Sequence, residues 1–152
     1  MEIRSLDCIE VKYPIFGSNL FVPANYLEQV IIKIMQFSKK DTEITLIARG
    51  TSGAICSGYV LSGLYNQGYT NIKIILSRKH VTRHDYPFQT ADGIVIFIDD
   101  IIETGETLAS VIEEYGYIDY AFVSTKELTM NEYISKRNYE IISKNVKVLY
   151  LG

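Results

Sequence analysis

Residues 94–107 read Ile-Val-Ile-Phe-Ile-Asp-Asp-Ile-Ile-Glu-Thr-Gly-Glu-Thr, and this stretch sets the prediction of the fold. It opens with an unbroken apolar run, which is typical of a strand buried on both faces of a parallel sheet. Two adjacent carboxylates, Asp99 and Asp100, follow directly after that strand. A Thr-Gly-Glu-Thr turn then leads into an apolar pattern of helical period that begins at Leu108. The stretch is therefore a strand–turn–helix unit with polar residues at the carboxyl end of the strand.

The same alternation of apolar strands and helical patterns extends over most of the chain. Strands are predicted at 43–48, 71–76, 93–98, 120–124 and 146–151, and helices at 25–37, 53–68, 108–115 and, from a weaker pattern, 131–143. Because strands and helices alternate, we predict an α/β fold with a mostly parallel central sheet flanked by helices. No linker or repeat divides the chain, so residues 1–152 are expected to form a single domain.

The composition argues against several classes of function. The 152 residues are 47% hydrophobic and 22% charged, as in an ordinary globular domain. The net charge of -3 argues against general nucleic-acid binding, which requires a basic face. No apolar run approaches the roughly 18 residues of a membrane span, and the first residues carry no signal-peptide core. Cys8 and Cys56 are far apart in the sequence, which fits a reduced, cytoplasmic setting with Cys56 in the core.

The turn after the 94–98 strand has the chemistry of a sugar-phosphate site. Gly105 permits a positive φ or a close approach of the backbone, and the amides that open the next helix form an anion site. Thr104 and Thr107 add hydroxyl donors, while the paired carboxylates can accept hydrogen bonds from vicinal ribose hydroxyls or hold Mg²⁺. A purely structural interpretation, with Thr104 as the helix N-cap, does not explain the crowding of Asp99 and Asp100. Their repulsion costs stability unless a ligand or cation offsets it.

These residues resemble the signature by which type I phosphoribosyltransferases bind 5-phosphoribosyl-1-pyrophosphate (PRPP): an apolar strand, two acidic residues, two apolar residues and Thr-Gly-x-Thr. The resemblance implies transfer of the 5-phosphoribosyl group of PRPP to a nucleobase, with release of pyrophosphate and with Mg²⁺ as cofactor, as in nucleotide salvage. It implies that Asp99 and Asp100 hold the ribose hydroxyls, with Asp100 as the metal ligand. The turn, including Gly105 and Glu106, would hold the 5′-phosphate, with the Glu106 side chain directed outward.

Two residues near this signature favour a 6-oxopurine as the acceptor base. Glu103 stands where many purine-using members have an aspartate proposed to act as the base near the purine ring, although its side chain is longer. Lys126 follows the predicted 120–124 strand, where hypoxanthine-guanine and xanthine-guanine relatives place a lysine that contacts the exocyclic oxygen. The resemblance therefore makes Glu103 a catalytic candidate and Lys126 a base-binding candidate.

Two further polar segments follow predicted strands. Residues 48–53 are small apart from one arginine and are similar to the short Arg-Gly loop that holds the pyrophosphate in this family, which assigns Arg49 and Gly50 to PRPP binding. Residues 78–92 form a long polar connection, a length typical of functional lids. The family has a loop there that closes during reaction, so Lys79 and His84 are catalytic candidates that would stabilise the departing charge.

Several alternatives stay open at this point. Orotate-using members carry Lys and His in their lid loop, so an orotate-type enzyme is one alternative. A regulatory protein on the same fold that senses PRPP or a nucleotide without turnover is another. Family members often pair, so a homodimer is expected, with small molecules as partners and with neither nucleic acid nor membrane. A small hood over the base is expected from the terminal segments, 1–19, 129–152 or both.

Overall fold

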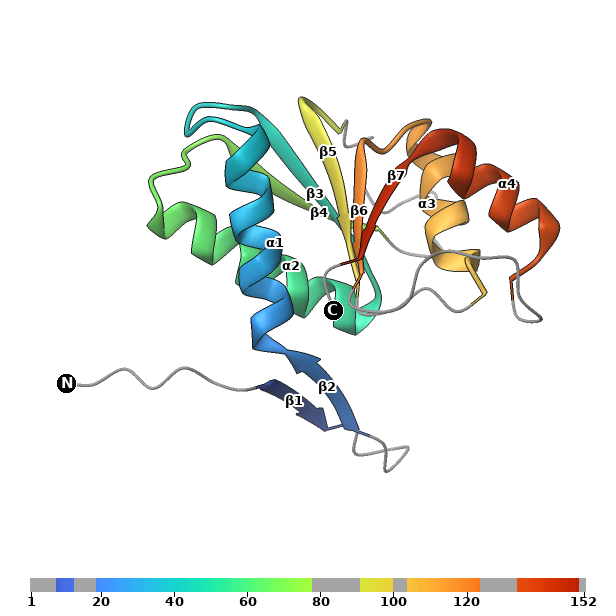
Figure 1. Ribbon diagram of the computed structural model, residues 1–152, viewed down its shortest axis with the longest axis horizontal. Coiled ribbons are helices and arrows are strands. Elements are labelled where there is room, and N and C mark those ends of the chain that lie inside the picture. The colour runs from blue at the N-terminus through green and yellow to red at the C-terminus, as the bar shows by residue number, and fades with distance from the viewer. Residues whose placement is uncertain (1–7, 13–18, 78–90, 100–103, 124–133, 151–152) are drawn as a thin grey trace, which may run out of the picture.

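The computed structural model describes residues 8–12, 19–77, 91–99, 104–123 and 134–150, and within them a five-stranded parallel sheet lies between helices (Figure 1). In chain order the elements are β1 (Cys8–Lys12), β2 (Asn19–Pro23), α1 (Ala24–Phe37), β3 (Ile44–Arg49), α2 (Gly50–Asn66), β4 (Ile72–Ser77), β5 (Ile94–Ile98), α3 (Glu106–Tyr115), β6 (Tyr120–Val123), α4 (Lys136–Asn145) and β7 (Lys147–Tyr150). The main sheet has the strand order β4-β3-β5-β6-β7, with every pair parallel. The predicted fold class is confirmed.

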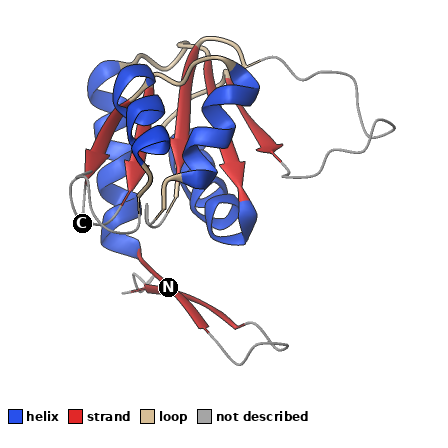
Figure 2. Cartoon of the chain, turned by 90° about the vertical axis from the view of Figure 1, so that its right-hand side faces the viewer, coloured by secondary structure: helices blue, strands red, loops and turns tan. Residues whose placement is uncertain are grey.

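Helices cover both faces of this sheet, as Figure 2 shows. Along β3, Ile44 and Leu46 lie in one buried cluster with residues of α1 and α2, whereas Ile47 lies in a second cluster with residues of α3 and α4. Because successive side chains of a strand point to opposite faces, this alternation gives the sheet two separate cores. Cys56 is completely buried in the first of them, as predicted. None of the described helices combines the length and apolar character needed to cross a membrane.

The antiparallel pair β1–β2 was not predicted from the sequence. These strands pair from Cys8 opposite Pro23 to Lys12 opposite Asn19, and they form a sheet separate from the main one. The pair lies beyond the carboxyl-terminal edge of the main sheet, next to the start of α1 (Figures 1 and 2). Residues 1–19, which contain β1, were expected only as a possible hood, and β2 was not expected at all, because both strands lie outside the alternation of strands and helices from which the other elements were predicted.

One boundary differs from the prediction in a way that matters for the site. Helix α2 begins at Gly50 rather than at Gly53, so residues 48–53 are the end of β3 and the first turn of α2 instead of a loop. Gly50 has φ +81°, which lets the chain turn from strand to helix at once. A Cβ on Gly53 would lie 3.3 Å from the Ile98 carbonyl oxygen, so the first turn of α2 packs closely on the end of β5.

The order of the strands places a topological switch point between β3 and β5. These neighbours pair from Ile44 opposite Ile94 to Ile47 opposite Phe97, and their next helices, α2 and α3, cover opposite faces. In doubly wound sheets ligands bind outside the carboxyl ends of the strands at such a point. The same edge carries the polar residues that the sequence analysis singled out.

The opposite edge of the sheet, where β5 begins, depends on Gly93. The backbone N–H of Ile94 donates to the Glu43 carbonyl oxygen over 2.9 Å, which draws the two chains together. Gly93 has φ +70°, and a Cβ there would overlap the carbonyl oxygen of Glu43 and lie 2.6 Å from its carbon. Both the dihedral and the close approach therefore require glycine.

We predict that Gly93→Ala lowers the free energy of unfolding by more than about 2 kcal/mol, because it adds a backbone clash to the strain of a positive φ. Urea denaturation followed by circular dichroism measures the change. Gly116→Ala is the matched control, since Gly116 has φ +84° but a Cβ there would meet nothing within 4 Å. Its cost should be about 1 kcal/mol, from the dihedral alone. Equal costs at the two positions would contradict the role of the close approach.

Candidate functional site

Asp99, the first residue after β5, is held in place by three neighbouring elements. It is only 8% exposed, and its backbone N–H donates to the carbonyl oxygen of Phe122 in β6 over 3.1 Å. Its carbonyl oxygen accepts from the hydroxyl of Tyr26 in α1 at 2.8 Å, and its Oδ1 accepts from the hydroxyl of Ser52 in α2 at 3.1 Å. The structure thus fixes a carboxyl group at the switch point, beside the first turn of α2.

The turn before α3 has the backbone geometry of an anion site. Gly105 is the N-cap of α3, with φ +78° and ψ -1°, and as a glycine it has no side chain with which to cap the helix. The first amides of a helix have no partner within the helix and lie at the positive end of its dipole. Thr104 was considered as the N-cap, and that interpretation is wrong by one residue. Its hydroxyl nevertheless accepts from the Glu106 N–H, over 3.3 Å.

Helix α2 presents a second helix start at the same edge. Gly50 is exposed there, and Arg49, its N-cap, makes no side-chain hydrogen bond to the helix amides. The ends of β3 and β5 are neighbours, so the starts of α2 and α3 lie on either side of the switch point. This arrangement suits a ligand that carries anionic groups at two places.

The Arg49 guanidinium makes contacts that the sequence did not predict. Its Nε and Nη2 donate to the hydroxyl of Ser77 in β4 over 3.1 and 2.6 Å, and its Nη2 also pairs with the carboxylate of Glu114 in α3. The Ser77 hydroxyl donates to the same carboxylate over 3.0 Å. Arg49 lies opposite Ser77 in the sheet, which explains why the two side chains meet. The side chain of Arg49 is 11% exposed, so its guanidinium is largely buried in this pairing.

The turn before α3 rests on α4, which the sequence analysis did not connect with the site. The side-chain nitrogen of Asn138 donates to the Thr104 carbonyl oxygen over 3.1 Å and to the Glu106 carboxylate over 3.2 Å. A Cβ on Gly105 would lie 3.0 Å from Ile142 and 3.2 Å from Ile134. The only sequence signal was an asparagine at the third position of the last helix, where a capping box would place Glu or Gln.

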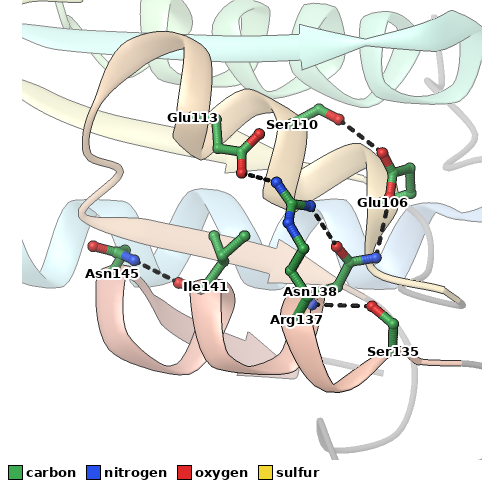
Figure 3. A network of polar contacts seen from close by, with 8 residues as sticks. All are labelled: Glu106, Ser110, Glu113, Ser135, Arg137, Asn138, Ile141 and Asn145. Carbon is green, nitrogen blue, oxygen red and sulfur yellow. Dashed lines mark hydrogen bonds and ion pairs between the residues drawn. The ribbon is translucent and has the colours of Figure 1, made fainter.

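The two remaining described residues of the turn are exposed. Thr107 lies in the first turn of α3, where its hydroxyl is accessible. Glu106 was expected to point outward, and its side chain is exposed but is also turned toward α4 (Figure 3). Its carboxylate accepts from Asn138 and, over 3.4 Å, from the hydroxyl of Ser110.

Five of the predicted site residues lie outside the described residues, and their roles stay predictions: Lys79, His84, Asp100, Glu103 and Lys126. Among the candidates that the structure does describe, Asp99, Gly50 and the 104–107 turn lie at one edge of the sheet. Arg49 starts from the same edge, but its guanidinium is directed toward Ser77 and Glu114.

Comparison with known proteins finds similarity at the level of structure. No protein-family model matches the sequence, and no curated protein sequence matches it significantly. An adenine phosphoribosyltransferase is similar over 96% of this chain and 95% of its own, with a TM-score of 0.53 and 13% sequence identity. HGPRT-ase from Leishmania tarentolae in complex with GMP aligns over 73% of this chain and 72% of its own, with a TM-score of 0.45 and 13% identity. At this identity the likeness to the adenine phosphoribosyltransferase establishes a shared fold and nothing further.

The free energy of unfolding at alkaline pH should report on the cluster of Arg49, Ser77 and Glu114, because all three side chains interact with Tyr115. Burial, followed by the negative charge of Glu114, raises the pKa of Tyr115 above its ordinary value of 10.0. The pKa is higher in the folded than in the unfolded state, so the stabilising contribution of the neutral phenol is complete below pH 10.0 and is lost as the pH rises through the folded-state pKa.

We therefore predict that Tyr115→Phe, which cannot ionise, makes the free energy of unfolding fall less steeply with pH above about 10 than in the wild type. Urea denaturation at a series of alkaline pH values measures this slope. Tyr117→Phe, at an exposed position just after α3, controls for removal of one tyrosine hydroxyl. Identical slopes for the wild type and Tyr115→Phe would show that the cluster does not hold the phenol neutral.

Proposed function

We propose that this protein is a phosphoribosyltransferase that transfers the 5-phosphoribosyl group of PRPP to a 6-oxopurine and releases pyrophosphate. The observation that carries the proposal is the meeting of a fixed carboxyl group, Asp99, with the starts of α2 and α3 at the β3–β5 switch point. PRPP carries a 5′-phosphate at one end, a pyrophosphate at the other and ribose hydroxyls between them. The fold shared with an adenine phosphoribosyltransferase supports the same activity class.

In this proposal the 5′-phosphate, the ribose and the pyrophosphate of PRPP each contact different residues at the carboxyl-terminal edge of the sheet. The 104–107 turn binds the 5′-phosphate through its amides and the hydroxyls of Thr104 and Thr107. Asp99 and Asp100 accept hydrogen bonds from the ribose hydroxyls. The amides at Gly50 face the pyrophosphate. Carboxylate oxygens are the ligands that Mg²⁺ prefers, so Asp100 would hold the ion, which would supply positive charge beside the pyrophosphate.

The reaction itself requires little covalent chemistry of the protein. A ring nitrogen of the base forms a bond to C1′ of the ribose, and the bond from C1′ to the pyrophosphate oxygen breaks, its electron pair leaving with the pyrophosphate. Positive charge develops on the ribose ring, as in glycoside chemistry. Glu103 takes the proton from the attacking nitrogen, and Lys126 binds the exocyclic oxygen of the base. The 78–92 segment, with Lys79 and His84, covers the leaving group and excludes water.

In this proposal Arg49 binds the pyrophosphate only after a change of hydrogen-bond partners. Its guanidinium pairs with Glu114 and Ser77, so contact with the pyrophosphate requires it to leave these partners when PRPP binds. A guanidinium matches two phosphate oxygens at once, which gives the exchange a driving force. The observed pairing also favours one alternative, a PRPP- or nucleotide-sensing protein without turnover, in which Arg49 keeps its partners.

The surroundings of the site complete the proposal. The β1–β2 pair lies beyond the edge where the base would bind, and we propose that it contributes to a small hood (Figure 1). The homodimer and the cytoplasmic setting expected from the sequence belong to the same proposal. An orotate-type enzyme differs from it only in the acceptor, so the acceptor decides between the two.

Incubation of the full chain with PRPP, Mg²⁺ and single bases should release pyrophosphate with hypoxanthine, guanine or xanthine, but not with orotate or adenine. A coupled phosphate assay after pyrophosphatase measures the release. Release with orotate alone would favour the pyrimidine enzyme. Binding of PRPP in calorimetry without release under any base would favour the sensor, and absence of PRPP binding would refute the proposal.

Asp100→Asn combined with Thr104→Val should weaken PRPP binding about a hundredfold or more, since hydrogen bonds to charged groups contribute roughly 1.5–3 kcal/mol each. Calorimetry with Mg²⁺ measures the affinity, and thermal unfolding verifies that the variant is folded. The matched control is Asp41→Asn with Thr70→Val, which makes the same chemical changes at exposed positions before β3 and β4, at the other edge of the sheet. Unchanged affinity in the folded Asp100/Thr104 variant would contradict the assignment of the ribose and 5′-phosphate sites.

A further inference from the structure

Asn138 is a buried amide in the first turn of α4. It is 5% exposed, and its backbone N–H donates over 3.1 Å to the hydroxyl of Ser135, the N-cap of the helix. The Asn138 side chain takes no part in this cap and instead points from α4 toward the turn before α3 (Figure 3). A buried amide costs stability unless its polar atoms are hydrogen-bonded, so these contacts are what maintains it there.

The chemistry of its partners fixes the orientation of this amide. The Thr104 carbonyl oxygen, at 3.1 Å, and the Glu106 carboxylate, at 3.2 Å, both accept hydrogen bonds and donate none. The NH₂ end of Asn138 must therefore face the turn. Its oxygen faces the Arg137 guanidinium at 3.5 Å, and this guanidinium also pairs with Glu113 of α3. The contacts thus run from Glu113 in the last turn of α3 through α4 and back to the start of α3.

The hydrogen bond to Thr104 sets the direction of one peptide group. No described peptide bond is cis, and in a trans peptide the C=O and the following N–H point in opposite directions. With the Thr104 carbonyl directed at α4, the Gly105 N–H is directed away from α4. Gly105 itself is pressed against α4, where a Cβ would lie 3.3 Å from the Cβ of Asn138. The turn therefore has the Thr104 carbonyl on the α4 side and the Gly105 N–H on the side away from α4.

The second hydrogen bond of Asn138 acts on a charge. Glu106 is the first residue of α3, and a free carboxylate there would compete with an anionic ligand for the positive end of the helix. Asn138 and Ser110 instead hold this carboxylate toward α4 and along the helix. The side-chain amide of Asn138 thus directs the Gly105 N–H toward the anion site and holds the Glu106 carboxylate away from it.

We infer that Asn138 is the positioning residue of the anion-binding turn, acting through the Thr104–Gly105 peptide and the Glu106 carboxylate on the 5′-phosphate of PRPP. This inference rests on the proposed function. It extends the site to α4, which lies in the 129–152 segment that was expected only as a possible hood over the base.

Asn138→Asp tests the inference, because it keeps the size of the side chain and replaces two N–H donors by a carboxylate. At pH 8 it should weaken PRPP binding by about tenfold or more, since both hydrogen bonds are lost and the new charge repels Glu106. Asn145→Asp is the matched control on the same helix, since that amide is exposed and donates to the Ile141 carbonyl oxygen of its own helix at 2.7 Å (Figure 3). It should stay within about twofold of the wild type.

Two further measurements separate positioning from general destabilisation. Adding Glu106→Gln to Asn138→Asp should restore most of the affinity, because the new amide can donate to the new carboxylate and the repulsion is removed. Ile34→Val, which removes a methylene from the buried core on the opposite face, should lower the melting temperature without changing the affinity.

The outcomes distinguish this inference from the function on which it rests. Wild-type protein that fails to bind PRPP–Mg²⁺ in calorimetry overturns both. Wild-type binding together with unchanged affinity in folded Asn138→Asp overturns the inference alone. Equal losses in Asn138→Asp and in Asn145→Asp or Ile34→Val also overturn it, because the effect would then follow stability rather than the turn.

Discussion

The parallel pairing of β3 with β5 is the constraint on which the rest of the site depends. Since α2 and α3 leave these neighbours toward opposite faces, their first turns lie on either side of the point where both strands end. Two helix starts and one fixed carboxyl group, Asp99, are thereby brought together from segments that are distant in the sequence. Because Gly53 has no side chain, the first turn of α2 packs closely against Ile98 at the end of β5.

The carboxyl-terminal edge of the main sheet is stabilised by polar side-chain contacts as well as by the two apolar cores. Arg49, Ser77 and Glu114 connect the ends of β3 and β4 to α3, while Asn138 connects the start of α3 to α4. These side chains are largely buried or turned inward, so they act on the shape of the edge. The same fold serves many functions through the residues at this edge, and function must therefore be argued from them.

The sequence was sufficient for most of the fold, because buried parallel strands are apolar throughout and amphipathic helices repeat with their own period. It also placed Asp99 and the 104–107 turn at the carboxyl end of a buried strand, since the apolar run, the adjacent carboxylates and the Thr-Gly turn are visible in a local segment. The partners of Arg49 and Asn138 were not predictable, because both contacts join distant positions whose approach depends on packing. The start of α2 was missed because glycine and serine in its first turn resemble a loop.

The contact between α4 and the turn before α3 also has a consequence for the order in which the chain folds. Thr104 and Asn138 are separated by 34 positions, and Asn138 belongs to the last helix of the chain. During synthesis the strand that ends in Asp99 and the helix that follows it emerge well before the segment on which their turn rests. The central strands can therefore assemble first, but the 104–107 turn acquires its final backbone direction only when α4 has docked against it.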